Sequence, residues 1–338
     1  MRSAIMVLLI TSVVACDGSQ GPQGPQGPQG APGTNGQHAP DGGNGAGDIE
    51  QVALPGPAFF PENIVAANDG TLFVTSIGDG SVVKIAPDRT KVTTFLPAQT
   101  VQPIGKTGLL LDEAKGRLWV CQVANNFSQA STLDRYDLAT GTRAESHALA
   151  TPGALCNDLA IDAAGNFYVT NSFFGIERLA SGAAAADPLT VWNSGPLYQP
   201  ATQGGFGVDG IAIDGSNVYT NNVEKGLLVR TPIQADGTAG APVAIAGVSL
   251  SGTDGIRLLA PNILVVTEAN IDAISKVVID PAANSGVRTL LSNRLDRPCG
   301  VAIFDNEAWV TDGQIGRLTG GDTTPLNVPF LVERVLVL

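Results

Sequence analysis

The chain has 338 residues, a formal net charge of −12 at neutral pH and a mean hydropathy of +0.16. Such an acidic chain lacks the basic footprint that nucleic-acid binding requires, so nucleic acid is not an expected partner. The excess of acidic residues is compatible with binding a divalent cation and, more simply, with solubility.

The first sixteen residues have the features of a bacterial lipoprotein signal. Met1-Arg2 precedes an apolar stretch, Ala4 to Val14, that is too short to span a membrane. The string Val13-Val14-Ala15-Cys16 resembles a lipobox and predicts lipid attachment at Cys16. We therefore expect a membrane-anchored, extracytoplasmic protein that faces the periplasm or the cell surface. A plain signal peptide with an incidental cysteine is the alternative.

Residues 17–47 form a predicted tether. From Gly21 to His38 the sequence repeats Gly-x-y six times, which is the pattern that a collagen triple helix requires. Six triplets are few, so we favour a stiff, extended spacer over trimerisation through this segment. Residues 39–47 continue as a glycine-rich, flexible stretch.

Residues 48–338 contain six similar short segments, spaced 45 to 52 residues apart. Each opens an apolar run, and most runs lead through a polar turn into a second strand rich in β-branched and aromatic residues. This period predicts an all-β fold, a six-bladed β-propeller with four-stranded antiparallel blades around a central channel. The segments are Glu62-Asn63-Ile64, Thr107-Gly108-Leu109, Asn157-Asp158-Leu159, Asp209-Gly210-Ile211, Asp254-Gly255-Ile256 and Cys299-Gly300-Val301.

The first residue of each segment is expected to face the channel axis. The resulting ring is Glu62, Thr107, Asn157, Asp209, Asp254 and Cys299. Its carboxylate and amide oxygens suit a hard cation such as calcium, whereas carboxylates clustered without a cation would resist ionisation. Thr107 and Cys299 are expected to line the channel without binding the ion. The alternative is that the acidic and amide residues only cap turns.

Three cysteines remain if Cys16 carries lipid. The odd number leaves at least one of Cys121, Cys156 and Cys299 unpaired. A disulfide between Cys121 and Cys156 and a set of buried free thiols are both compatible with the sequence. No Cys or His spacing indicates a zinc site.

The ring resembles the calcium site of the gluconolactonase/regucalcin (senescence-marker-protein-like) family of six-bladed propellers, with paraoxonases as more distant relatives. Pro61-Glu62-Asn63-Ile64, Asn157-Asp158-Leu159, Asp209-Gly210-Ile211 and Thr253-Asp254-Gly255-Ile256 carry the resemblance. It implies that calcium, or another divalent cation, is held by Glu62, Asn157, Asp209 and Asp254. It also implies hydrolysis of a lactone or related ester, with the metal polarising the carbonyl and Asp254 activating water.

The chain departs from the family pattern at three places. Asp209 replaces an asparagine and Leu159 replaces a glycine, which alters the charge and the pocket wall. His38 and His147 lie away from the six segments, so a histidine-assisted mechanism is not expected. Asp158, next to a predicted ligand, is expected to satisfy backbone amides, with tuning of the metal site as the alternative. The segments Asn125–Thr132 and Tyr198–Gly207 are expected to shape the pocket.

Two other functions remain open at this stage. One is a non-catalytic propeller that is stabilised by calcium and binds a ligand or protein partner through its loops. The other is a propeller of the strictosidine-synthase-like or NHL type, which shares the spacing of the repeats but lacks this metal site.

Overall fold

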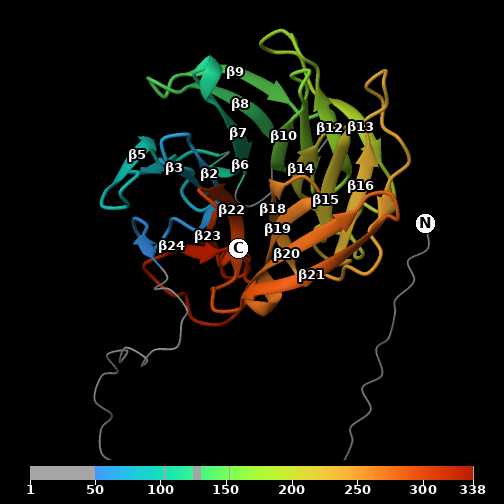
Figure 1. The fold of residues 1–338 in the computed structure, drawn as a ribbon. Coiled ribbons are helices and arrows are strands. Elements are labelled where there is room, and N and C mark those ends of the chain that lie inside the picture. Colours follow the sequence, from blue (N-terminus) through green and yellow to red (C-terminus); the bar gives the residue numbers. More distant parts are fainter. Residues whose placement is uncertain (1–49, 103, 125–130, 152, 338) are drawn as a thin grey trace, which may run out of the picture. The chain divides into compact units, whose positions relative to one another are not determined.

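The computed structural model describes residues 50–102, 104–124, 131–151 and 153–337. Within these residues the strands form six four-stranded antiparallel sheets around a central axis (Figure 1). The predicted six-bladed β-propeller is thereby confirmed. The predicted lipid attachment at Cys16 and the segments 1–16 and 17–47 lie outside the described residues.

Five blades take their strands from consecutive parts of the chain, from the axis outward. Blade one is β2 (Pro61–Ala66), β3 (Leu72–Ser76), β4 (Val82–Ile85) and β5 (Val92–Leu96). Blade two is β6 (Gly105–Asp112), β7 (Arg117–Val123), β8 (Thr132–Asp137) and β9 (Arg143–Ala148). Blade three is β10 (Cys156–Ile161), β11 (Phe167–Asn171), β12 (Gly175–Leu179) and β13 (Thr190–Ser194). Blade four is β14 (Val208–Asp214), β15 (Asn217–Asn222), β16 (Leu227–Pro232) and β17 (Val243–Ala244). Blade five is β18 (Thr253–Ala260), β19 (Ile263–Glu268), β20 (Ala273–Asp280) and β21 (Ser285–Ser292).

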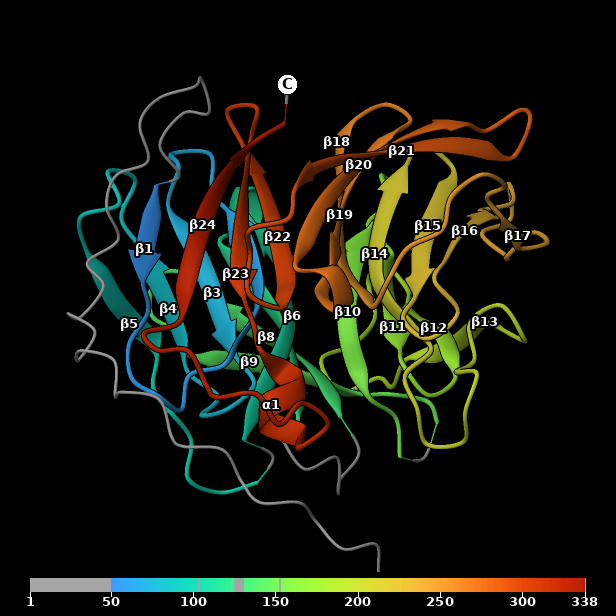
Figure 2. The same ribbon diagram turned by 90° about the horizontal axis from the view of Figure 1, so that it is seen from below.

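Blade six closes the ring by combining both ends of the propeller sequence. It contains β22 (Pro298–Phe304), β23 (Glu307–Asp312), β24 (Leu331–Leu336) and β1 (Gln51–Ala53). The outermost strand β1 pairs antiparallel with β24, with Val52 opposite Val332, and the two strands run side by side in Figure 2. In a closed ring each blade keeps only short, protected sheet edges.

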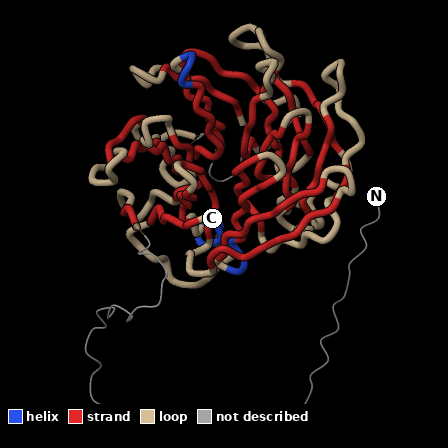
Figure 3. The backbone as a smooth tube through the Cα atoms, viewed as in Figure 1, coloured by secondary structure: helices blue, strands red, loops and turns tan. Residues whose placement is uncertain are grey.

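Helical structure is limited to short connections. The described residues contain η1 (Glu113–Lys115), η2 (Ala269–Ile271) and α1 (Ile315–Thr319), and strands dominate the remainder (Figure 3). None of the helices in the described part of the chain is long and apolar enough to cross a membrane.

Burial explains why the apolar runs form the inner half of each blade. All five residues of β3 are buried, whereas outermost β21 is largely accessible. Large side chains fill the gaps between blades: Trp119 of blade two packs on Phe167 of blade three, with ring centroids 4.4 Å apart. Such contacts fix the blades against one another, so that the channel-lining strands have defined positions.

Each innermost strand has a β-bulge at the segment that the sequence repeat identified. In blade one the pairing register shifts between Pro61 and Ile64, so that Glu62 and Asn63 together face Thr75 of β3. The same shift occurs at the other five segments. A bulge inserts one extra residue and re-aims side chains, which explains why the first residue of each segment leaves the regular in–out alternation.

Candidate functional site

The first residues of the six bulges line one cavity of about 370 Å³ at one end of the channel. They are Glu62, Thr107, Asn157, Asp209, Asp254 and Cys299. The structure therefore brings together all six residues that the sequence placed in a ring, including the four predicted calcium ligands. The cavity volume falls within the range of typical small-molecule sites, ~300–1,000 Å³.

Two polar side chains of this ring have defined hydrogen-bond acceptors. Asn157 Nδ2 donates to Asp209 Oδ2 at 2.8 Å, and the Cys299 thiol lies 3.8 Å from the carbonyl oxygen of Arg297, to which it donates. Within the described residues, Glu62 Oε2 and Asp209 Oδ1 are buried and accept no hydrogen bond. Buried carboxylate oxygens without a donor are costly.

The pKa values of the ring reflect the crowding of these carboxyl groups. Burial, followed by the charges of Asp254 and Asp209, raises the pKa of Glu62 well above its ordinary value. Burial also raises the pKa of Asp209 strongly, and it raises that of Asp254 to about 6. Burial is also the main cause of the raised pKa of the Cys299 thiol. A divalent cation would relieve this repulsion and favour the ionised forms.

The donor set fits a hard cation, although the side chains are not arranged around one. Within the described residues no three His, Cys, Asp or Glu side chains form a group ready to hold a metal ion. The predicted set includes the amide of Asn157, whose nitrogen is turned toward Asp209. Turning this amide would present its oxygen instead, alongside the unpartnered oxygens of Glu62 and Asp209. Oxygen donors of this kind are those that calcium prefers.

Residues of the second strands hold the bulges in place and link neighbouring blades. The residues opposite the bulges are Thr75, Cys121, Thr170, Asn221, Thr267 and Thr311. Thr75 Oγ1 accepts from the backbone N–H of Asn63 at 3.0 Å and donates to the carbonyl of Thr107 in the next blade at 2.8 Å. Thr311 links Gly300 to the carbonyl of Glu62 in the same way. These hydrogen bonds position the backbone beneath the acidic ring.

Blade two replaces this hydrogen bond with a covalent link. Cys121, which faces the bulge of blade two, forms a disulfide with Cys156, the residue directly before Asn157. The disulfide alternative is thus confirmed. Cys299 is the free cysteine of the described part of the chain, and it is buried.

The second position of the bulge is glycine in four blades because the next blade approaches closely. A Cβ on Gly108 would lie 2.4 Å from the carbonyl oxygen of Asn157, and one on Gly300 would lie 2.7 Å from Cα of Asn63. Blades one and three carry Asn63 and Asp158 at this position instead. Their side chains reach into the centre of the channel.

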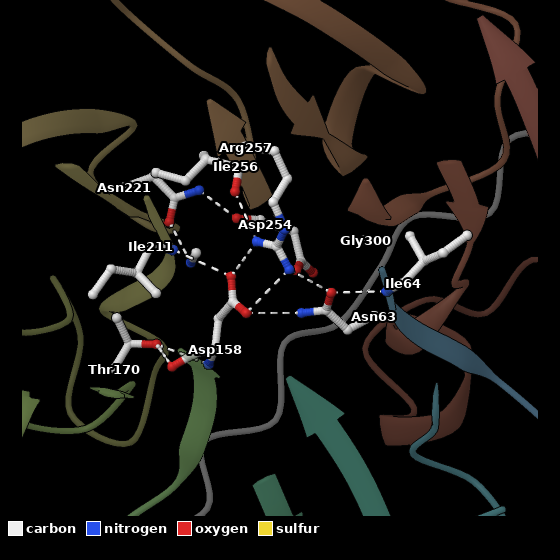
Figure 4. Close-up of polar contacts among 12 residues, drawn as sticks. Asn63, Ile64, Asp158, Thr170, Ile211, Asn221, Asp254, Ile256, Arg257 and Gly300 are labelled. Atoms are coloured by element: carbon white, nitrogen blue, oxygen red, sulfur yellow. Dashed lines mark hydrogen bonds and ion pairs between the residues drawn. The ribbon is translucent and has the colours of Figure 1, made fainter. Parts of the chain in front are cut away.

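Asn63 and Asp158 meet Arg257 of β18 in the middle of the channel (Figure 4). Arg257 Nη1 donates to Asp158 Oδ2 at 2.7 Å, and Nη2 donates to Asn63 Oδ1 at 2.8 Å. Asn63 Nδ2 donates to Asp158 Oδ1 at 3.1 Å. Asp158 also accepts from the backbone N–H of Ile211, in agreement with its predicted role, whereas its ion pair with Arg257 was not predicted from the sequence.

A second cavity, of about 360 Å³, is lined by the residues of the inner strands that follow the bulges. Its walls are mainly aliphatic and include Leu110, Ile213 and Leu258, and Arg257 also lines it. The cluster of Arg257, Asp158 and Asn63 therefore lies between the acidic ring and the aliphatic strand ends.

The loops supply the upper walls of the first cavity. Phe206, from the predicted pocket segment Tyr198–Gly207, lines it, so this expectation is confirmed. In the other predicted segment, Asn125–Thr132, residues 125–130 lie outside the described residues. His147 is not among the lining residues, and its Nδ1 lies 2.8 Å from the carbonyl oxygen of Asp187.

Comparisons with known proteins show relatedness in fold. No protein-family model and no curated protein sequence matches the chain. A luciferin-regenerating enzyme superposes with a TM-score of 0.60 at 14% identity, covering 86% of this chain and 96% of the enzyme. A gluconolactonase from Xanthomonas campestris gives 0.59 at 16% identity, with coverage of 86% and 90%. Virginiamycin B lyase from Staphylococcus aureus gives 0.55 at 15%, with coverage of 78% and 82%. At these identities the likeness establishes the propeller fold.

Proposed function

We propose that the protein is a calcium-dependent hydrolase of a lactone or related ester. The observation that carries this proposal is the meeting of Glu62, Asn157, Asp209 and Asp254 in one cavity, with two buried carboxylate oxygens that accept no hydrogen bond within the described residues. Another divalent cation of similar hardness would satisfy the same donors. The gluconolactonase among the structural neighbours supports this reaction class by fold analogy alone.

In this proposal Glu62, Asn157, Asp209 and Asp254 hold the ion. When bound, the ion supplies Lewis-acid polarisation of the substrate carbonyl. Asp254 accepts a proton from the attacking water, whose oxygen bonds to the carbonyl carbon. The ring C–O bond breaks, and Asp254 returns the proton to the leaving alkoxide, which yields a hydroxy acid.

Calcium titration combined with an activity panel tests this function. We expect calorimetric binding of calcium to the full-length chain, a rise in thermal stability with calcium, and lactone hydrolysis that chelation abolishes. Glu62→Gln and Asp209→Asn should weaken calcium binding, whereas Asp236→Asn, a change in an exposed turn outside the cavity, should not. Calcium binding without hydrolysis of any lactone or aryl ester would instead support the non-catalytic, calcium-stabilised propeller.

We also propose that the protein is anchored by lipid at Cys16 on the extracytoplasmic side of a membrane. The resemblance of Val13–Cys16 to a lipobox supports this, as does the Cys121–Cys156 disulfide, because disulfides persist in oxidising compartments. Cys16→Ser should move the protein from the membrane fraction to the soluble fraction. Unchanged membrane fractionation would contradict lipid attachment at this residue.

A further inference from the structure

The walls of the acidic cavity differ in character from its floor. Above the ring, five apolar side chains from blades one, three, four and six line the cavity. They are Ile77, Leu155, Phe206, Val223 and Ile315. Ile77 and Leu155 are only 3% and 4% exposed, so they present fixed surfaces.

The Phe206 wall is supported from behind. Its ring packs against Phe173, with centroids 5.8 Å apart, and Phe173 in turn packs against the core. The backbone N–H of Gly207 donates to the carbonyl of Ser172 at 2.8 Å, which ties the loop to blade three next to Phe206. An apolar surface that is held in this way is a preformed wall for a ligand.

Polar side chains of the cavity rim gather on the opposite side, near blades five and six. Arg297 and Asp322 line the rim there and bind each other, with Arg297 Nε donating to Asp322 Oδ2 at 3.1 Å. Arg297 Nη1 donates to the carbonyl of Ala269 at 3.1 Å. These two groups are engaged by protein partners, and Asn270 and Thr319 complete the polar part of the rim. Polar side chains above the ring are thus confined to this side, and the apolar side has none to pair with several substrate hydroxyls.

We propose that the substrate is a lactone or ester that carries an unbranched alkyl chain, and that the chain lies against Ile77, Leu155 and Phe206 while the carbonyl faces the acidic ring. This inference rests on the proposed hydrolase function and adds the substrate class. A polyhydroxylated sugar lactone would place hydroxyl groups against apolar walls without partners, which is unfavourable. An alkyl chain has no hydroxyl groups that need partners, so against these walls it gives up only its contact with water.

The reaction balances for such a substrate as it does for any lactone. Water adds its oxygen to the carbonyl carbon, the ring C–O bond breaks, and one proton passes to the alkoxide. The product is a hydroxy acid that retains the alkyl chain. No oxidant, reductant or second substrate is needed.

Chain-length dependence tests this proposal. We would measure kcat/KM of the calcium-loaded, full-length protein for γ-lactones with alkyl chains of increasing length and for D-glucono-δ-lactone. Each buried methylene should raise kcat/KM by up to ~4-fold until the cavity is filled. The sugar lactone should be the poorest substrate. A flat series with the sugar lactone as the best substrate overturns the substrate class and leaves the hydrolase function intact.

Binding of a non-hydrolysable ligand separates this inference from the hydrolase proposal. Alkyl lactams of the same ring size would be titrated by calorimetry into the wild type, into Phe206→Ser, which alters the proposed wall, and into Leu110→Ser, which alters the second cavity. We expect Phe206→Ser to weaken binding at least 10-fold and Leu110→Ser to leave it unchanged. If no lactone is hydrolysed but this pattern holds, the hydrolase function fails and the alkyl site stands. Absence of lactam binding, or its loss in Leu110→Ser alone, overturns the alkyl site.

Discussion

The two ends of the central channel are built from the same six strands, yet they present opposite chemistry. At one end the first residues of the bulges gather carboxylates, an amide and a thiol around a cavity of about 370 Å³. At the other end the same strands, beyond their bulges, surround a cavity of about 360 Å³ with aliphatic side chains. The size of a cavity therefore says little about its function here. The bulge, which re-aims one side chain per blade, decides which end carries the polar groups.

The cluster of Arg257, Asp158 and Asn63 lies between these two environments. Arg257 is a cation within the channel, and its charge lowers the pKa values of Glu62 and Asp254 against the stronger effect of burial. Arg257 therefore separates the two cavities in space, while its charge still acts on the acidic residues at one end.

The largest expected effect is a loss of hydrolysis on neutralising the acidic end. Asp254→Asn should reduce kcat by about 10²–10⁴-fold, because the proposed base is removed while the side-chain shape is kept. Leu258→Ala, at the aliphatic end, should leave kcat near the wild-type value. Steady-state kinetics at saturating calcium provides the measurement. Equal losses in both variants would mean that the two ends are not functionally distinct.

Removing the cation between the two ends should destabilise the whole domain. Arg257→Met leaves the buried Asp158 carboxylate without its ion pair and should lower the free energy of unfolding by about 3–5 kcal/mol. Adding Asp158→Asn should recover much of this loss, since no buried charge then remains unpaired. Urea unfolding of both variants measures the effect.

A surface ion pair serves as the control for that comparison. Arg334 and Glu307 lie 2.9 Å apart with partly exposed side chains, so Arg334→Met should cost no more than about 1 kcal/mol. If Arg257→Met lowers the free energy of unfolding as little as Arg334→Met does, the central cluster does not stabilise the channel.

Part of the difference between the two ends of the channel was predictable from the sequence. The first residue of each repeat identified Glu62, Asn157, Asp209 and Asp254 because the repeat places equivalent residues at equivalent positions in every blade. The bulges themselves were not predicted, and neither were the threonines opposite them, because both depend on strand register. Arg257 was missed because its partners lie 99 and 194 residues away in sequence. One clue was present: Asn63 and Asp158 stand where the other four repeats have glycine.

The disulfide should stabilise the acidic end in particular. Replacing both Cys121 and Cys156 by alanine should cost about 2–4 kcal/mol, because a closed loop between residues 35 apart restricts the unfolded chain. Calcium affinity should also fall, since Cys156 immediately precedes Asn157. Unfolding under non-reducing conditions gives the first value and calorimetry the second. An unchanged calcium affinity would show that the bond supports the blades but not the ring.

A pH dependence of stability is also expected from Asp312 of β23 in blade six. Burial raises the pKa of Asp312 to about 9, so the folded protein keeps this proton between about pH 4 and pH 9 while the unfolded chain releases it. Stability should therefore fall as pH rises through this window. Asp312→Asn should flatten the dependence, because the amide keeps an acceptor for the N–H of Asp296 and carries no charge.

Melting temperatures at pH 6 and pH 9 measure this change. Asp236→Asn, in an exposed turn, is the control and should retain the wild-type slope. An identical slope in Asp312→Asn would assign the pH dependence to other groups.

The closure of blade six by β1 and β24 has a consequence for the order in which the protein is assembled. Gln51 and Glu333 hydrogen-bond across 282 residues of chain, so this pairing forms only after almost the whole domain has been synthesised. Glu62 and Cys299 belong to the two blades that meet at this seam, where Thr311 bonds the carbonyl of Glu62. A nascent chain with five finished blades already contains Glu62, Asn157, Asp209 and Asp254, but it lacks blade six, which joins blade five to blade one and so fixes Glu62 relative to Asp254. Metal binding would then report the completed molecule rather than any of its parts.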